Sequence, residues 1–213
     1  MEVYETEQDQ IEAIKKWWKE NGKAVVIGAI LGFGSLIGYQ QWQANVKTAN
    51  ESASQEYSTL MIQLQQGEYQ SVKDIGSRVL TNFSDTSYAV MTALALAKVN
   101  VEEGNLAVAK TYLQLAIDQD KMAEYQHIAR LRLGRILLAE DQAQQALTLV
   151  NGVKAAGFQA PYDELKGDIY TVLGNVDSAR MSYESALESM EEGIDQSELK
   201  MKLDDLGGSE ARP

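Results

Sequence analysis

The chain has 213 residues, of which 45% are hydrophobic and 23% charged, with a formal net charge of −12, one histidine and no cysteine. This apolar fraction predicts a folded chain rather than whole-chain disorder, and the acidic balance argues against a nucleic-acid binder. The lack of cysteine excludes disulfides, thiolate nucleophiles and cysteine-ligated zinc, and His127 alone makes a histidine-based triad or a multi-histidine metal site nearly untenable. We therefore expect no cofactor and no metal.

Residues 1–23 form a charged leader with four lysines and six acids. Ile11, Ile14 and Trp18 recur there at helical spacing, and the Asn21-Gly22 pair then interrupts the pattern. We predict a short amphipathic helix that lies on the cytoplasmic face of a lipid bilayer.

The next 23 residues, from Ala24 onward, carry no charge. Between residues 24 and 42 a helix would rise roughly 28 Å, which nearly matches a hydrocarbon core of about 30 Å. Aromatic residues stand at both ends of this stretch, as in the aromatic belts of spanning helices: Trp17, Trp18, Tyr39 and Trp42. The pattern predicts a transmembrane anchor at 24–42, followed by a linker at 43–50.

Two other interpretations of the apolar stretch were weighed. A cleaved signal peptide favours a shorter core and a small-x-small cleavage site, which the bulky Trp42 spoils before Asn45. A buried core helix would seldom lack charge over so many residues. A retained single-pass anchor agrees best with the length and the flanks.

The lysines set the expected orientation. All four lysines of the leader precede the anchor, whereas Lys47 is the only basic residue soon after it. The positive-inside rule then puts the N-terminus in the cytoplasm and the acidic remainder on the other side, although the charge rule alone leaves the opposite topology open.

Small residues follow one face of the predicted anchor. They are spaced by 4, 4 and 3 residues and comprise Ala24, Gly28, Gly32 and Ser35. Small side chains let a second membrane helix approach closely, which favours a helix-packing face. The spacing does not distinguish a homodimer from a foreign partner, and glycine is in any case commoner in membrane helices.

After residue 50 the apolar periods are helical, and turn residues recur along the chain. Gly67, Gly104, Asp141 and Gly174 are spaced by 37, 37 and 33 residues, close to the 34-residue tetratricopeptide period. We predict a repeat domain at 51–196 with units near 51–86, 87–123, 124–158 and 160–193, then a capping helix at 197–208 and a frayed tail at 209–213.

The side chains of the last unit agree with this period. Gly167, Tyr170, Ala179, Tyr183 and Ala186 occupy its alternating small and aromatic positions, where a small residue admits a bulky neighbour from the next helix. The predicted fold is all-α: a single N-terminal transmembrane helix followed by a tetratricopeptide-like helical-repeat solenoid. A generic helical bundle with coincidental spacing is the alternative.

No catalytic motif was found. Gly152 and Gly157 have phosphate-loop spacing, but Phe158 and Gln159 stand where lysine and a hydroxyl residue are required. We therefore expect no enzyme.

A binding groove is the remaining candidate site. By repeat position the first helix of each pair would line a concave face with Met91, Leu94, Lys98, Val101, Ile128, Leu131, Arg135, Leu138, Glu164, Asp168 and Thr171. The mixture suits adaptable peptide contacts, although stacking alone would bury many of the same apolar residues.

The leader MEVYETEQDQIEAIKKWWKENGKA, the glycine-spaced anchor, the helical repeats and the closing ELKMKLDDLGG resemble the YfgM family. The resemblance implies a tetratricopeptide-like ancillary subunit of the SecYEG translocon in the bacterial inner membrane, with type II topology and a periplasmic repeat domain. It also implies association with a PpiD-like periplasmic chaperone and with emerging secretory polypeptides, and it carries no catalytic residues.

Two further hypotheses come from other classes of protein. One is a self-assembling membrane-tethered scaffold, unrelated to secretion, that uses the glycine face for homodimers. The other is an enzyme with an unrecognised site, which would need clustered groups with perturbed pKa values.

Overall fold

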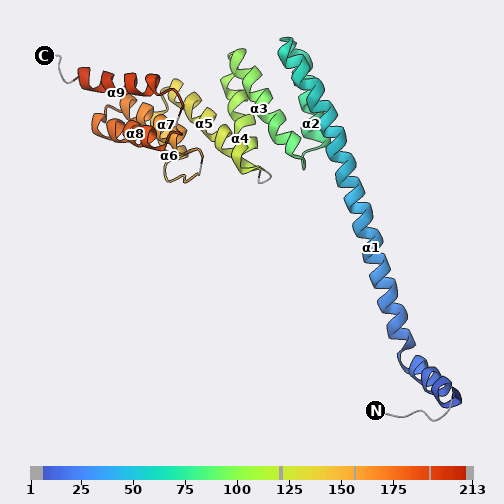
Figure 1. Ribbon diagram of the computed structural model, residues 1–213. Helices are drawn as coiled ribbons and strands as arrows, with labels where there is room; N and C mark the ends of the chain where they lie inside the picture. Colours follow the sequence, from blue (N-terminus) through green and yellow to red (C-terminus); the bar gives the residue numbers. More distant parts are fainter. Residues whose placement is uncertain (1–6, 120–121, 156, 192, 210–213) are drawn as a thin grey trace. The chain divides into compact units, whose positions relative to one another are not determined.

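A computed structural model describes residues 7–119, 122–155, 157–191 and 193–209. The chain divides into two compact units, Met1–Glu51 and Ser52–Pro213. The described residues contain helices and no strand, which confirms the predicted all-α class (Figure 1). The helices are α1 (Glu7–Gln65), α2 (Tyr69–Asn82), α3 (Ser87–Glu102), α4 (Leu106–Asp118), α5 (Ala123–Ala139), α6 (Ala143–Val150), α7 (Gln159–Val172), α8 (Val176–Ser189) and α9 (Ser197–Ser209).

The Asn21-Gly22 pair does not end a helix, contrary to the sequence-based expectation, because α1 continues through it. The Asn21 side-chain amide donates to the carbonyl of Trp17 at 3.1 Å, so it bonds within the helix instead of capping it. The Trp18 ring packs over Gly22, where a methyl group would lie 3.1 Å from the indole. Local packing therefore offsets the low helix propensity of glycine.

Residues 43–50, predicted as a linker, are also helical. The segment contains neither glycine nor proline, and its polar side chains bond at helical spacing. The Asn50 amide donates to the carbonyl of Val46 at 2.8 Å, and the Lys47 ammonium lies 3.8 Å from the Glu51 carboxylate.

The apolar part of α1 is uncovered by protein. Ile30 and Phe33 are 66% and 68% exposed, and every described side chain from 23 to 48 is exposed. Within the described residues, one helix is long and apolar enough to cross a membrane, with a window of mean hydropathy 1.5 that is 6% buried. A core helix of a soluble domain would bury these side chains, so this exposure favours a lipid environment.

In the second unit the helices form successive hairpins. α3 contacts α4, α5 contacts α6 and α7 contacts α8, while the second helix of each pair contacts the first helix of the next (Figure 1). The first helices also contact one another directly, α3 with α5 and α5 with α7. The first helices thus form one layer and the second helices another.

The four turn residues identified by their spacing all lie in turns with positive φ. Their φ values are 75° for Gly67, 79° for Gly104, 60° for Asp141 and 73° for Gly174. In the second turn the amide of Asn105 donates to the carbonyl of Asn100 at 2.7 Å, and the other three turns make the equivalent bond. This is the Schellman pattern, which satisfies the last carbonyls of a helix and requires a left-handed residue.

Small residues allow neighbouring helices to touch. A methyl group at Gly167 of α7 would lie 2.2 Å from the Tyr183 ring of α8, and one at Gly134 of α5 would lie 2.8 Å from the Leu165 side chain of α7. Both bulky partners are buried. These contacts explain the small and aromatic positions seen in the sequence.

Ion pairs also recur with the repeat. The Lys73 ammonium of α2 lies 2.8 Å from the Glu103 carboxylate after α3, and the Lys110 ammonium of α4 lies 2.5 Å from the Glu140 carboxylate after α5. Each pair joins the second helix of one hairpin to the end of the next hairpin's first helix. Both residues of the second pair follow those of the first by 37 positions, the spacing of the turns.

We predict that Asp141→Gly raises the free energy of unfolding by roughly 0.5 kcal/mol, because glycine adopts the left-handed conformation without the Cβ penalty of an L-residue. Asp141→Ala should lower the free energy of unfolding, since alanine lacks the local hydrogen bonding that lets aspartate tolerate this conformation. Thermal unfolding of the full chain in mild detergent, followed by circular dichroism, measures both. A lower melting temperature for Asp141→Gly would contradict the prediction.

We predict that Gly167→Ala costs about 1–3 kcal/mol of stability, because the new methyl overlaps the Tyr183 ring. In a Tyr183→Ala background the same change should become stabilising, by up to about 1 kcal/mol, since only helix propensity remains. Gly207→Ala, where a methyl meets nothing within 4 Å, is the matched control. Equal costs in both backgrounds would show that the ring contact is not the cause.

Candidate functional site

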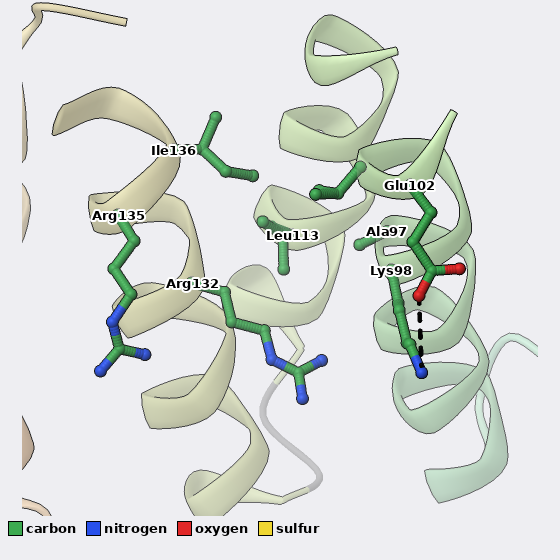
Figure 2. Close-up of a pocket in the computed structure, with 8 residues that line it drawn as sticks. Ala97, Lys98, Glu102, Leu113, Arg132, Arg135 and Ile136 are labelled. Carbon is green, nitrogen blue, oxygen red and sulfur yellow. Dashed lines mark ion pairs between the residues drawn. The ribbon is translucent and has the colours of Figure 1, made fainter. Parts of the chain in front are cut away.

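A groove of about 330 Å³ lies where α3 and α5 run beside each other over α4 (Figure 2). Its residues come from three helices, in the order α3, α4 and α5: Ala97, Lys98, Val101, Glu102, Leu113, Arg132, Arg135 and Ile136. Helical spacing explains the set, because residues three and four apart share a helix face.

The floor of the groove is apolar. Ala97 and Leu113 are each 1% exposed and Ile136 is 9% exposed, so these side chains belong to the core and show one surface to the groove. Val101 is 42% exposed and is an apolar member of a rim whose other members are charged. Such a floor with a polar rim is typical of ligand and peptide sites.

The rim carries more positive than negative charge. On α3 the Lys98 ammonium lies 3.6 Å from the Glu102 carboxylate. On α5 neither Arg132 nor Arg135 forms an ion pair or a side-chain hydrogen bond with any residue that the structure describes. Figure 2 shows Arg132 extending from α5 toward α3, whereas the guanidinium of Arg135 points away from α3.

Three of the residues expected in a concave groove line this cavity, namely Lys98, Val101 and Arg135. Leu94 and Leu131 are buried in the core instead. Met91, Ile128 and Leu138 are half-buried, and Thr171 is exposed.

Sequence reasoning missed Glu102 and Arg132. Helical spacing could have identified both, because Glu102 lies four residues after Lys98 and Arg132 lies three residues before Arg135.

The acidic end of the expected groove is covered by α9. The Lys202 ammonium of α9 lies 2.7 Å from the Glu164 carboxylate and 3.0 Å from that of Asp168, both on α7. Burial lowers the pKa of Lys202, but these two carboxylates outweigh burial and raise the pKa above its usual value. Glu164 and Asp168 are therefore engaged within the chain and do not line the α3–α5 groove.

Tyr183 extends the same cluster into the core. Its hydroxyl donates to the Asp168 carboxylate at 2.8 Å. Burial, opposed by the hydroxyl of Thr171 and reinforced by Asp168, raises the pKa of Tyr183 to about 12. The phenol therefore stays protonated at neutral pH and holds α7 against α8.

The buried carboxylate of Asp163 on α7 is hydrogen-bonded within the fold. Burial raises the pKa of Asp163, but hydrogen bonds from Gln159, Lys166 and Ser185 to its carboxylate outweigh burial and lower the pKa. No group of three or more side chains able to hold a metal ion occurs among the residues described.

His127 packs against two aromatic rings of the next repeat. Its Nδ1 lies 3.0 Å from the Tyr162 hydroxyl, and its ring centre lies 5.2 Å from that of Phe158. Burial and the charge of Arg130 lower the pKa of His127. This histidine therefore joins α5 to α7 and has no nucleophile to activate within the described contacts.

The predicted helix-packing face lies on the exposed part of α1. Ala24, Gly28, Gly32 and Ser35 are all exposed, and a methyl group at Gly28 or Gly32 would meet nothing within 4 Å. The Ser35 hydroxyl donates to the carbonyl of Leu31 at 2.6 Å, so it is satisfied within the helix.

Comparison with known proteins extends over nearly the whole chain. The family model described as "Tetratricopeptide repeat-like domain" matches residues 15–208. A Haemophilus influenzae protein named "Ancillary SecYEG translocon subunit" is 34% identical over 94% of this chain and 97% of its own length. An Escherichia coli protein of the same name is 30% identical over 97% of this chain and 99% of its own length.

A more distant Neisseria gonorrhoeae protein, also named "Ancillary SecYEG translocon subunit", is 27% identical over 97% of this chain and all of its own length. No solved structure shows a significant match to the chain. The full-length agreement covers the leader, the apolar helix and the repeats together. The chain therefore belongs to the family of tetratricopeptide repeat-like ancillary SecYEG translocon subunits.

Proposed function

We propose that this protein is a membrane-anchored, non-enzymatic adaptor of the SecYEG translocon. The observation that carries the proposal is the match along nearly the full length to proteins named as ancillary subunits of that channel. The exposed apolar helix supports an anchor in the inner membrane. The groove between α3 and α5 supports a binding role for the repeat domain.

The orientation we propose places the N-terminus in the cytoplasm and the repeat domain in the periplasm. Four lysines precede the apolar stretch, and Lys47 alone follows it closely, which is the charge bias expected for this topology. The domain boundaries proposed from the sequence, with the anchor at 24–42 and repeats at 51–196, are consistent with this placement. A repeat domain held at the channel exit would meet emerging chains at a high local concentration, so modest affinity suffices.

The partners we propose are the translocon itself, a PpiD-like periplasmic chaperone and emerging secretory polypeptides. The small-residue face with Ala24, Gly28, Gly32 and Ser35 would meet a partner helix inside the membrane, because its surface is open in the structure. The groove would meet polypeptide outside the membrane. Self-association through the same membrane face is the competing scaffold hypothesis, and the experiments below separate the two.

We predict that protease added to intact spheroplasts degrades the repeat domain and leaves a fragment containing the leader and the membrane helix. Anti-tag detection of an N-terminal epitope measures the fragment, and a cytoplasmic protein serves as the control for intact membranes. Full protection of the repeat domain until the membrane is permeabilised would contradict the proposed topology and place the repeat domain in the cytoplasm.

We predict that Gly28→Leu combined with Gly32→Leu reduces recovery of translocon subunits by about tenfold in affinity purification from membranes, because two bulky side chains block close helix approach. The repeat domain should keep its melting temperature, since a methyl group at either glycine meets nothing within 4 Å. Ala29→Leu, which enlarges a small residue off this face, is the matched control.

Quantitative mass spectrometry of the same purification separates the two hypotheses. Wild-type protein that recovers channel subunits and a periplasmic chaperone supports the adaptor. Recovery of this protein alone, with a dimer-sized product on crosslinking, would support the self-assembling scaffold instead. Unchanged recovery in the double variant would remove the glycine face from the proposal.

A further inference from the structure

We infer that the groove between α3 and α5 binds an extended peptide segment that carries a large apolar side chain followed by carboxylates. The inference rests on the proposed adaptor function and specifies the chemistry of the groove's occupant. Its basis is the combination of an apolar floor with two arginines that have no partner among the described side chains.

The two groove arginines differ from the lysines that lie at helix contacts in the second unit. There the lysines at the helix contacts are satisfied by carboxylates, as in the Lys73–Glu103, Lys110–Glu140 and Lys202–Glu164 pairs. Arg132 and Arg135 share one face of α5 and form no ion pair with a described residue, although the whole chain has a net charge of −12. Glu102 also lines the groove, but its carboxylate pairs with Lys98. The groove is thus a local positive site on an acidic protein, and it selects for carboxylates that reach it.

The position of the charges orients the occupant. Glu102 lies on α3 and already faces Lys98, so acidic groups of a ligand are repelled from that wall and attracted to α5. Arg132 extends toward α3 above the floor, whereas Arg135 lies one turn along α5 and points outward (Figure 2). A peptide that places one carboxylate at Arg132 can place a second at Arg135 as it leaves the groove.

The floor and the size of the groove determine which apolar side chains of the bound peptide can fit. Ala97, Leu113 and Ile136 give the groove an apolar floor. The groove volume of about 330 Å³ is near the lower limit for ligand sites. This space suits one or two aliphatic side chains rather than a whole helix. An extended segment presents such side chains while its charged neighbours remain at the rim.

The test uses the full chain in detergent and a fluorescein-labelled peptide, SGSGLLEDGS, with binding followed by fluorescence anisotropy. Two control peptides isolate the contributions: SGSGLLQNGS keeps the leucines without charge, and SGSGSSEDGS keeps the charge without leucines. We expect the first peptide to bind at least about tenfold more tightly than either control, and its affinity to fall as salt is added.

The variants assign the effect to the groove. Arg132→Gln should weaken binding of the acidic peptide more than Arg135→Gln, and the double variant should weaken it by about tenfold, to the level of the neutral peptide. Arg180→Gln on α8, outside the groove, is the matched control and should bind as wild type. Charge reversal of both groove arginines to glutamate should transfer the preference to SGSGLLKKGS.

Several outcomes would overturn the inference: equal binding of acidic and neutral peptides, wild-type affinity in the double variant, or anionic vesicles that compete with the peptide for the same arginines. Circular dichroism melts verify that each variant is folded. Co-purification of channel subunits is measured in parallel. If channel subunits still co-purify but the peptide does not bind, the proposed peptide chemistry is wrong and the proposed adaptor function is retained. If channel subunits do not co-purify with the wild-type protein, the proposed adaptor function is itself wrong.

Discussion

The contact of a small residue on one helix with a bulky residue on the next is the interaction on which the repeat domain depends. At Gly167 and Gly134 the space for a methyl group is already filled by Tyr183 and Leu165, so a glycine at each position lets the bulky partner pack against the helix backbone. Close approach buries the apolar stripe of each hairpin against its neighbour. The arrangement of the helices in the second unit, including the groove, follows from hairpins stacked in this way.

The groove is a by-product of that stacking. Because first helices contact first helices, α3 and α5 lie side by side, and the second helix α4 closes the space beneath them with Leu113. Ala97, Leu113 and Ile136 therefore pack in the core and also line the groove. The stacking residues and the binding residues of such a domain are not separate sets.

The sequence predicts this architecture well where the conformational requirement is local. A left-handed turn residue, or a small residue in a helix, is visible at its own position, and the 37-residue spacing of Gly67, Gly104 and Asp141 located the turns. Prediction failed where a tertiary or side-chain contact overrode propensity. The Trp18 ring packs on Gly22, and the leader remains helical there. Lys202 pairs with Glu164, 38 residues away, and no local sequence pattern predicts that pair.

The last helix packs on the final hairpin of the described repeats. Leu199 and Leu206 of α9 are buried with Tyr183 and Ala186 of α8, so this part of the α8 surface is not available to another hairpin. A stack that exposed this surface would be a template for head-to-tail addition of a second molecule, and such contacts do not close. The α9 helix thus covers, with two of its leucines, an apolar surface of α8 that would otherwise be open to such a contact.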